Sequence, residues 1–324
     1  MKKLIFTMLG LSLLFPLWSW TPSNQPIELG PLPLSYTGLP DDYLFPTYLS
    51  DPFAVRTELG FKFLSISEAY PDELGEGARS DVALGLRFNF FRFSPSFDPS
   101  LGIEAELGFM TPFYMNASGN DMIGFDGVYY FSLSLKPFDW ITFRASRHHY
   151  CSHYGDEYDD NFDGNPYVDF DITLNLNMST LVRDDFVFSV AVYPMEIFNP
   201  QSRTSVMLYG DYAPILLGED ILTDRHTTPA YYAYLWYQLG IEVTHQLLSD
   251  HNAGSLYFAA QVSAWQMTGY APNISGRIGY MFPETEMPGA GMRLSLIYYD
   301  GQSTINNFIY TRERYTGIVF TIDV

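Results

Sequence analysis

Apolar and polar residues alternate with a period of two along much of this chain. The odd positions from Leu101 to Phe109 are apolar, and the even positions between them hold Gly102, Glu104, Glu106 and Gly108. From Val168 to Met178 the even positions are apolar, and the odd positions hold Asp169, Asp171, Thr173, Asn175 and Asn177. Such alternation predicts extended strands with one apolar and one polar face. Shorter examples occur at 141–146, 255–264 and 318–324.

The lengths of these segments and of the connections between them favour a membrane barrel. The run from Val168 to Met178 has the length that a tilted strand needs to cross a bilayer. Aromatic residues cluster near the predicted strand ends, and short connections such as 94–99 alternate with long polar ones such as 67–81. Soluble β-sandwiches also alternate, so a secreted β-sandwich binding protein is the alternative. The combination predicts an all-β fold, a transmembrane antiparallel up-and-down β-barrel.

The number of strands follows from the alternating segments and the turn signals between them. Candidate strands start near Ala54, Val82, Leu101, Met122, Ile141, Pro166, Asp185, Thr204, Ala230, Ser255, Ile274, Met292 and Tyr315. Bacterial barrels have an even number of strands, so one of these candidates is surplus. We expect about 12 strands, with the surplus between Tyr193 and Pro229, where turn signals are dense.

The N-terminal residues predict export across a membrane. Lys2 and Lys3 precede an apolar stretch from Leu4 to Leu17, which is the order found in a secretory signal peptide. This stretch is short for a membrane-spanning helix of about 20 residues. We therefore expect residues 1–20 to be a cleaved signal and 52–324 to form the barrel. The intervening 21–51, which hold six prolines, are interpreted as a periplasmic lead-in or an N-terminal plug.

Composition excludes several functional classes. Acidic residues outnumber basic ones by 37 to 17, and the formal net charge is −20. This excludes nucleic acid as a partner, because phosphate neutralisation requires clustered Lys and Arg. The single cysteine, Cys151, excludes a disulfide framework and any multi-cysteine metal centre. We expect no cofactor.

The densest chemistry lies between Arg147 and Asn161. Three of the six histidines fall within six residues there, followed by acidic residues. One interpretation is a polar cluster that stabilises the end of a strand, formed by His149, Ser152, His153, Asp156 and Glu157. A second is a metal site made by His149, His153 and Asp156. This requires a turn, since two residues four apart on a strand are separated by about 13 Å.

A third interpretation is catalytic. His149 and Cys151 are two residues apart, which places both on one face of a strand. A histidine and a nucleophile in this arrangement could hydrolyse lipid acyl esters at the rim of a barrel. Since no accompanying signature of an oxyanion hole is found, we expect a protein without enzymatic activity.

The polar faces of the predicted strands bear on what the barrel interior contains. Glu104, Glu106, Asp169 and Asp171 would face the lumen, and a narrow passage lined by carboxylates favours small cationic solutes. In the alternative, these acids pair with basic residues such as Arg144 and Arg293 and fill the interior. The expected role is therefore structural, or that of a narrow cation-favouring channel or binding barrel.

Three patches of sequence resemble a family of Gram-negative outer-membrane proteins with a domain of unknown function. The first is Leu44-Phe45-Pro46 through Leu49 and Asp51-Pro52. The second is a His-x-Ser-Ser-His-x-Gly-Asp-Glu motif, matched at His149, Ser152, His153, Gly155, Asp156 and Glu157, with Cys151 in place of the first Ser. The third comprises 299–303, Phe308 and 314–317.

The resemblance implies a barrel in the outer membrane of a diderm bacterium, and no established activity. The expected partners are outer-membrane lipid and the barrel assembly machinery, which would recognise the alternating C-terminal strand Phe320–Val324.

Overall fold

A computed structural model describes residues 26–30, 32–67, 77–116, 122–154, 181–220, 235–248, 253–283, 291–309 and 311–323. Within these residues, twelve strands form a closed barrel. They are β3 (Thr57–Ser67), β4 (Gly77–Pro95), β5 (Gly102–Asn116), β6 (Met122–Phe138), β7 (Ile141–Tyr154), β8 (Leu181–Val192), β9 (Thr204–Asp220), β10 (Leu235–Gln246), β11 (Ser255–Trp265), β12 (Pro272–Met281), β13 (Gly291–Gln302) and β14 (Arg312–Asp323). Short helices are α4 (Pro194–Phe198), η2 (Gln266–Thr268) and η3 (Asn306–Phe308).

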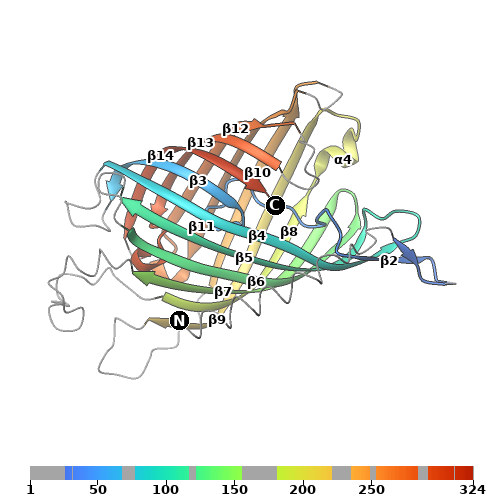
Figure 1. Ribbon diagram of the computed structural model, residues 1–324, viewed down its shortest axis with the longest axis horizontal. Coiled ribbons are helices and arrows are strands. Elements are labelled where there is room, and N and C mark those ends of the chain that lie inside the picture. Colours follow the sequence, from blue (N-terminus) through green and yellow to red (C-terminus); the bar gives the residue numbers. More distant parts are fainter. Residues whose placement is uncertain are drawn as a thin grey trace, which may run out of the picture.

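Each barrel strand pairs antiparallel with its neighbours in sequence, and the first pairs with the last. The seam between β14 and β3 runs from Ile322 opposite Thr57 to Glu313 opposite Ser67. Figure 1 shows the tilted strands lying side by side around the barrel. Closure leaves neither β3 nor β14 with an unpaired edge, which a strand surrounded by hydrocarbon cannot tolerate because each unpaired backbone group costs several kcal/mol.

The outer surface of the barrel is apolar. Along β3 the side chains of Leu59, Phe61 and Phe63 are exposed, whereas Lys62 between them is buried. The same alternation gives β6 an outer row of Tyr129, Phe131, Leu133 and Leu135. An apolar surface that extends around a barrel matches the hydrocarbon core of a bilayer. None of the helices in the described residues is both long and apolar enough to span a membrane.

The predicted fold class is confirmed, and so is the strand count of twelve. The expected position of the surplus strand was wrong, because β9 occupies Thr204–Asp220. The barrel closes without the candidate strand that starts near Pro166. That segment lies outside the described residues.

Residues before the barrel form two distinct parts. β1 (Ile27–Glu28) and β2 (Leu34–Gly38) make a small extension, in which β2 pairs with the final residues of β4. Figure 1 shows β2 projecting beyond the barrel at the end where β4 passes into β5. Residues 39–56, here called the lumen segment, then lie inside the barrel, where Phe45, Tyr48 and Leu49 are buried. The lumen segment leads directly into β3.

The connection between β13 and β14 fills the opposite end of the barrel. Ile305 and Phe308 in this connection have no exposed surface. Asn306 donates from its backbone N and its side-chain Nδ2 to Asp126 Oδ2 on β6, at 3.3 and 3.0 Å. Tyr114 on β5 donates to the same carboxylate oxygen at 2.8 Å. Both ends of the lumen are therefore occupied by segments of the chain itself.

Candidate functional site

The barrel interior is electrically balanced. Among the described residues, eight basic and eight acidic side chains are buried. They are Arg56, Lys62, Arg79, Arg87, Arg92, Arg183, Arg277 and Arg293, and Asp81, Glu104, Glu106, Asp126, Asp185, Asp211, Glu242 and Glu313. Each of these basic groups lies within 4.0 Å of a carboxylate oxygen. The formal charges of these buried side chains therefore sum to zero.

Glu104 and Glu106, predicted to face the lumen, do point inward but are paired. Arg92 binds Glu104 at 2.5 Å, and Arg87 binds Glu106 at 2.7 Å. Both acids have no exposed surface, so they fill the interior and do not line an open passage. The alternative that these acids pair with basic residues and fill the interior therefore holds for both, with Arg92 and Arg87 as partners in place of Arg144 and Arg293, which were named as examples. Asp169 and Asp171 lie outside the described residues.

The same ion pairs hold one side of the lumen segment. The backbone N of Leu44 donates to Glu104 Oε1 at 3.0 Å. Arg87 donates to the carbonyl O of Phe45 at 2.8 Å and lies over the ring of Tyr43, with its Cζ 4.0 Å from the ring centroid. These contacts attach the segment to β4 and β5.

Strands β9 and β10, on the opposite wall of the barrel, bind the middle of the lumen segment. Tyr48 donates to Asp211 Oδ1 on β9 at 2.9 Å, and its ring stacks on Tyr209 at 3.7 Å between centroids. The backbone N of Leu49 donates to Glu242 Oε1 on β10 at 2.5 Å. The lumen segment therefore spans the barrel from β4 and β5 to β9 and β10.

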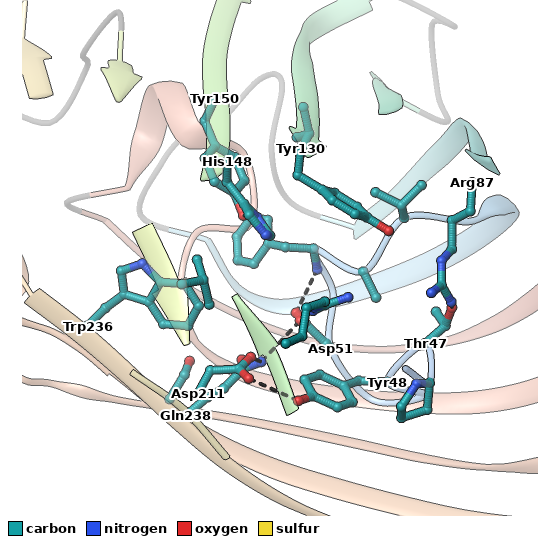
Figure 2. A pocket seen from close by; sticks show the side chains of 18 of the residues that line it. Thr47, Tyr48, Asp51, Arg87, Tyr130, His148, Tyr150, Asp211, Trp236 and Gln238 are labelled. Carbon is teal, nitrogen blue, oxygen red and sulfur yellow. Dashed lines mark hydrogen bonds between the residues drawn. The ribbon is translucent and has the colours of Figure 1, made fainter. Parts of the chain in front are cut away.

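A cavity remains between the lumen segment and the inner walls of β4 and of β6 to β11. It has a volume of about 40 Å³. Figure 2 shows its aromatic walls, which include Tyr130, His148, Tyr150 and Trp236, and the hydrogen bonds that join Tyr48, Asp211 and Gln238 beside it. Two basic residues, Arg87 and Arg144, and two acidic ones, Asp51 and Asp211, also line the cavity.

Strand β7 separates the residues of the histidine motif between its two faces. Tyr150 and Ser152 are buried and face inward, together with His148. His149, Cys151 and His153 alternate with them and face outward. The structure therefore places Ser152 away from His149 and His153, with which it was expected to form one polar cluster. Asp156 and Glu157 lie outside the described residues.

His149 has a carboxylate partner that sequence reasoning missed. Its Nδ1 lies 3.0 Å from Oδ1 of Asp184 on β8, and its ring stacks on Tyr129 of β6 at 4.7 Å between centroids. Arg147 donates to the other oxygen of Asp184 at 3.3 Å. A signal existed in the sequence, because Asp184 is an acid on the otherwise apolar outer face of a strand that includes Phe186 and Phe188.

Cys151 occupies a niche on the same outer face. Its Sγ lies 3.7 Å from the carbonyl O of Gly127, the residue opposite it on β6. Glycine is required for this packing, since a Cβ at position 127 would approach the Cys151 sulfur to 2.7 Å.

The described residues contain no group of three or more His, Cys, Asp or Glu side chains that could hold a metal ion. His149 and His153 share a face of a continuous strand, which keeps them about 13 Å apart. The turn that would bring them together at a metal is absent within β7.

Comparisons with known proteins identify no family for this chain. No family model matches the chain, and no curated protein matches it. Among solved structures, the Salmonella typhi outer membrane phospholipase dimer with bound calcium is 11% identical, with a TM-score of 0.49 and coverage of 91% of this chain and 94% of that one. Escherichia coli outer membrane phospholipase A is 11% identical, with a TM-score of 0.47 and coverage of 82% and 92%. LpxR from Salmonella typhimurium is 10% identical, with a TM-score of 0.36 and coverage of 82% and 100%. Likenesses of this size assign no role to any residue.

Proposed function

We propose that this chain is an outer-membrane β-barrel whose lumen is closed by its own lumen segment. The observation that carries the proposal is the span of residues 39–56 across the barrel, with hydrogen bonds to Glu104 on one wall and to Asp211 and Glu242 on the other. A barrel closed in this way has a structural or binding role at rest, and not that of an open pore.

Placement in the outer membrane of a diderm bacterium is supported by two independent features. The outer surface is apolar around the closed barrel, which suits a lipid partner. The N-terminal residues have the pattern of an export signal. Insertion by the barrel assembly machinery would use β14, the last strand of the barrel.

Passage of small cationic solutes would require the lumen segment to withdraw. In the closed barrel the buried charges of the described residues are balanced, so the interior has no electrostatic preference for cations. Removal of the segment would expose Asp211 and Glu242, whose oxygens now accept hydrogen bonds from Tyr48 and Leu49. A passage that favours cations would then form.

Single-channel recording in planar bilayers tests this proposal. We expect the folded wild-type protein to give no current steps. The double variant Tyr48→Ala/Glu242→Gln removes two anchors of the lumen segment, and we expect it to give current steps. Tyr237→Ala is the matched control, because Tyr237 is 41% exposed on the outer face of β10. Steps in the wild type would refute closure. Silence of the double variant, shown to be folded by faster gel migration before boiling, would refute closure by this segment.

A second candidate function is hydrolysis of lipid acyl esters at the outer face. The observation that favours it is the contact of His149 Nδ1 with Asp184 Oδ1 at 3.0 Å, on the same face as Cys151. A carboxylate in this position holds the Nδ1 proton, which leaves Nε2 of the imidazole as a base. Ionisable residues on a lipid-facing surface are costly, which favours a functional role for them.

Ester hydrolysis by this candidate site has two steps, formation of a thioester on Cys151 and its hydrolysis. His149 takes the proton of the Cys151 thiol, the sulfur attacks the ester carbonyl carbon, and the alcohol leaves with the proton returned by His149. Water, deprotonated by His149, then attacks the thioester, which releases the fatty acid and regenerates the thiol. Asp184 acts through His149 and is therefore a positioning residue.

Release of fatty acid from phospholipid vesicles tests the second candidate. This candidate requires activity in the wild type, its loss in Cys151→Ala and His149→Ala, and its retention in His245→Ala, which alters an exposed histidine bonded to Thr204 on another part of the barrel. Asp184→Asn should lower kcat more than KM and shift the pH profile. Equal turnover by the wild type and Cys151→Ala would exclude this function.

A further inference from the structure

The extension formed by β1 and β2 has one apolar face. Tyr36 on β2 lies opposite both Ile27 on β1 and Phe93 on β4, and directly opposed residues of an antiparallel sheet point to the same face. Leu34 is two residues from Tyr36 and therefore points the same way. The side chains of Ile27, Leu34 and Phe93 are exposed.

The opposite face of the extension is polar and packs on the chain. Ser35 lies opposite Glu28 on β1 and opposite Ser94 on β4. Ser35 and Ser94 are buried, and Ser94 Oγ donates to the carbonyl O of Pro99, in the β4–β5 connection, at 3.2 Å. The sheet of the extension is therefore amphipathic, and its apolar face is the one left open to a partner.

This apolar face continues into the lipid-facing surface of the barrel. Phe93 lies opposite Ile103 on β5, and Ile103 lies opposite Leu135 on β6. Leu135 in turn lies opposite Phe143 on β7. All four side chains are exposed on the outer surface. One apolar row therefore runs across the sheet from Ile27 in the extension to the outer wall of the barrel.

Aromatic residues mark the membrane interface close to this row. Phe138 and Trp140, at the β6–β7 connection, are exposed and stack at 5.8 Å between ring centroids. Exposed aromatic rings at the end of a membrane barrel belong to the girdle at the level of the lipid headgroups. Phe138 follows Leu135 by three residues, or about 10 Å along the strand. The connection 96–101 between β4 and β5 is short, which is typical of the periplasmic end.

We propose that the extension binds phospholipid of the inner leaflet, with Ile27, Leu34, Tyr36 and Phe93 in the interface between acyl chains and headgroups. The argument for lipid as the partner is the continuity of this face with the barrel surface that faces hydrocarbon. The inference rests on the proposed membrane location and adds a lipid-binding element outside the barrel. Because residue 39 directly follows β2, the contact also fixes the point at which the lumen segment enters the barrel.

Quenching of a fluorescent label by nitroxide lipids tests the proposal. Leu34→Cys, Glu28→Cys and Phe131→Cys are each made in a Cys151→Ala background, labelled with an environment-sensitive nitrobenzoxadiazole before refolding, and inserted into phosphatidylcholine vesicles. Lipid with a nitroxide near its headgroup should quench the label at position 34. Glu28 is the matched control, since it is exposed on the adjacent strand and points to the polar face, so its label should remain bright.

The label at Phe131 separates failure of this inference from failure of the membrane location. Phe131 is exposed on the outer face of β6, so its label reports insertion of the barrel itself. Quenching at position 131 but not at position 34 would overturn the proposal, and would leave the apolar face to a periplasmic protein. Equal quenching at positions 28 and 34 would also overturn it, and quenching at none of the three would refute the membrane location.

A second position makes the result independent of any local disturbance of β2. Ile27→Cys places the same label on β1, on the apolar face, and it should be quenched as strongly as the label at position 34. Faster gel migration before boiling shows that each labelled barrel is folded. Emission from position 27 that is unchanged by the nitroxide lipid, in a folded barrel quenched at position 131, would contradict the lipid contact.

Discussion

Breaking the ion pair between Arg87 and Glu106 should destabilise the barrel strongly. Arg87 donates to Glu106 at 2.7 and 2.8 Å and to the carbonyl O of Phe45 at 2.8 Å. Arg87→Met leaves the Glu106 carboxylate, which has no exposed surface, with the Tyr130 hydroxyl as its remaining hydrogen-bond donor among the described residues. Removal of one partner of a buried pair costs about 3–5 kcal/mol. We expect a loss of that size in the free energy of unfolding, measured by urea titration of the folded protein in lipid vesicles.

The double variant Arg87→Met/Glu106→Gln separates the buried charge from the lost packing. Neutralising Glu106 removes the uncompensated charge, and the remaining cost is the unsatisfied Phe45 carbonyl, about 1–3 kcal/mol. Lys136→Met is the control, because its pair with Asp139 is 3.9 Å long and partly exposed, so it should cost at most about 1 kcal/mol. If the single variant cost no more than this control, or if the double variant cost as much as the single one, the reasoning would be refuted.

Three further predictions concern the two ends of the barrel and its wall. Asn306→Ala should lower the free energy of unfolding by about 1–3 kcal/mol, because Asn306 Nδ2 donates to the buried Asp126; urea titration measures this, and a neutral effect would contradict closure of that end by the β13–β14 connection. A lipid-soluble maleimide should label Cys151, which lies on the outer face. It should not label the double variant Cys151→Ala/Ser152→Cys, because position 152 is fully buried on the inner face. Equal labelling of the two proteins would show that the two faces are wrongly assigned. In the β4–β5 turn, the hydroxyl and backbone N–H of Ser100 donate to Asp98 and hold the pKa of its carboxyl below the ordinary value. These hydrogen bonds therefore stabilise the fold at a pH above the ordinary pKa of Asp, and their contribution is lost as the pH falls through the lowered pKa of Asp98. Ser100→Ala should raise the Asp98 pKa in a carbon-13 NMR titration, and an unchanged value would exclude the hydroxyl as its cause.

The alternation of side chains predicted the barrel because it is a local property of an extended chain. Glu104 and Glu106 point inward, as the odd–even pattern of residues 101–109 requires, and the same rule places Ser152 opposite to Cys151. Neither inference needs to know which strands are neighbours. The pattern also offered the candidate strand at Val168–Met178, which the barrel closes without.

Contacts across the lumen and between strands could not be predicted in the same way. The pairing of Arg87 with Glu106 depends on the register of β4 against β5, which includes a shift between Asn89 and Phe91. The contact of His149 with Asp184 depends on the register between β7 and β8, and the register between two strands is not a local property of either sequence. The lumen segment has no periodicity from which a wall partner could be derived.

The lumen segment enters and leaves the barrel through the same mouth. Gly38 pairs with Phe91 near the end of β4, and β3 begins further along the same edge of β4, where Thr57 is hydrogen-bonded to Gly85. The segment therefore does not pass through the barrel from one end to the other, so it can leave the lumen without separating any two barrel strands. The withdrawal that we propose would thereby be a local rearrangement that leaves the pairing of the barrel strands intact.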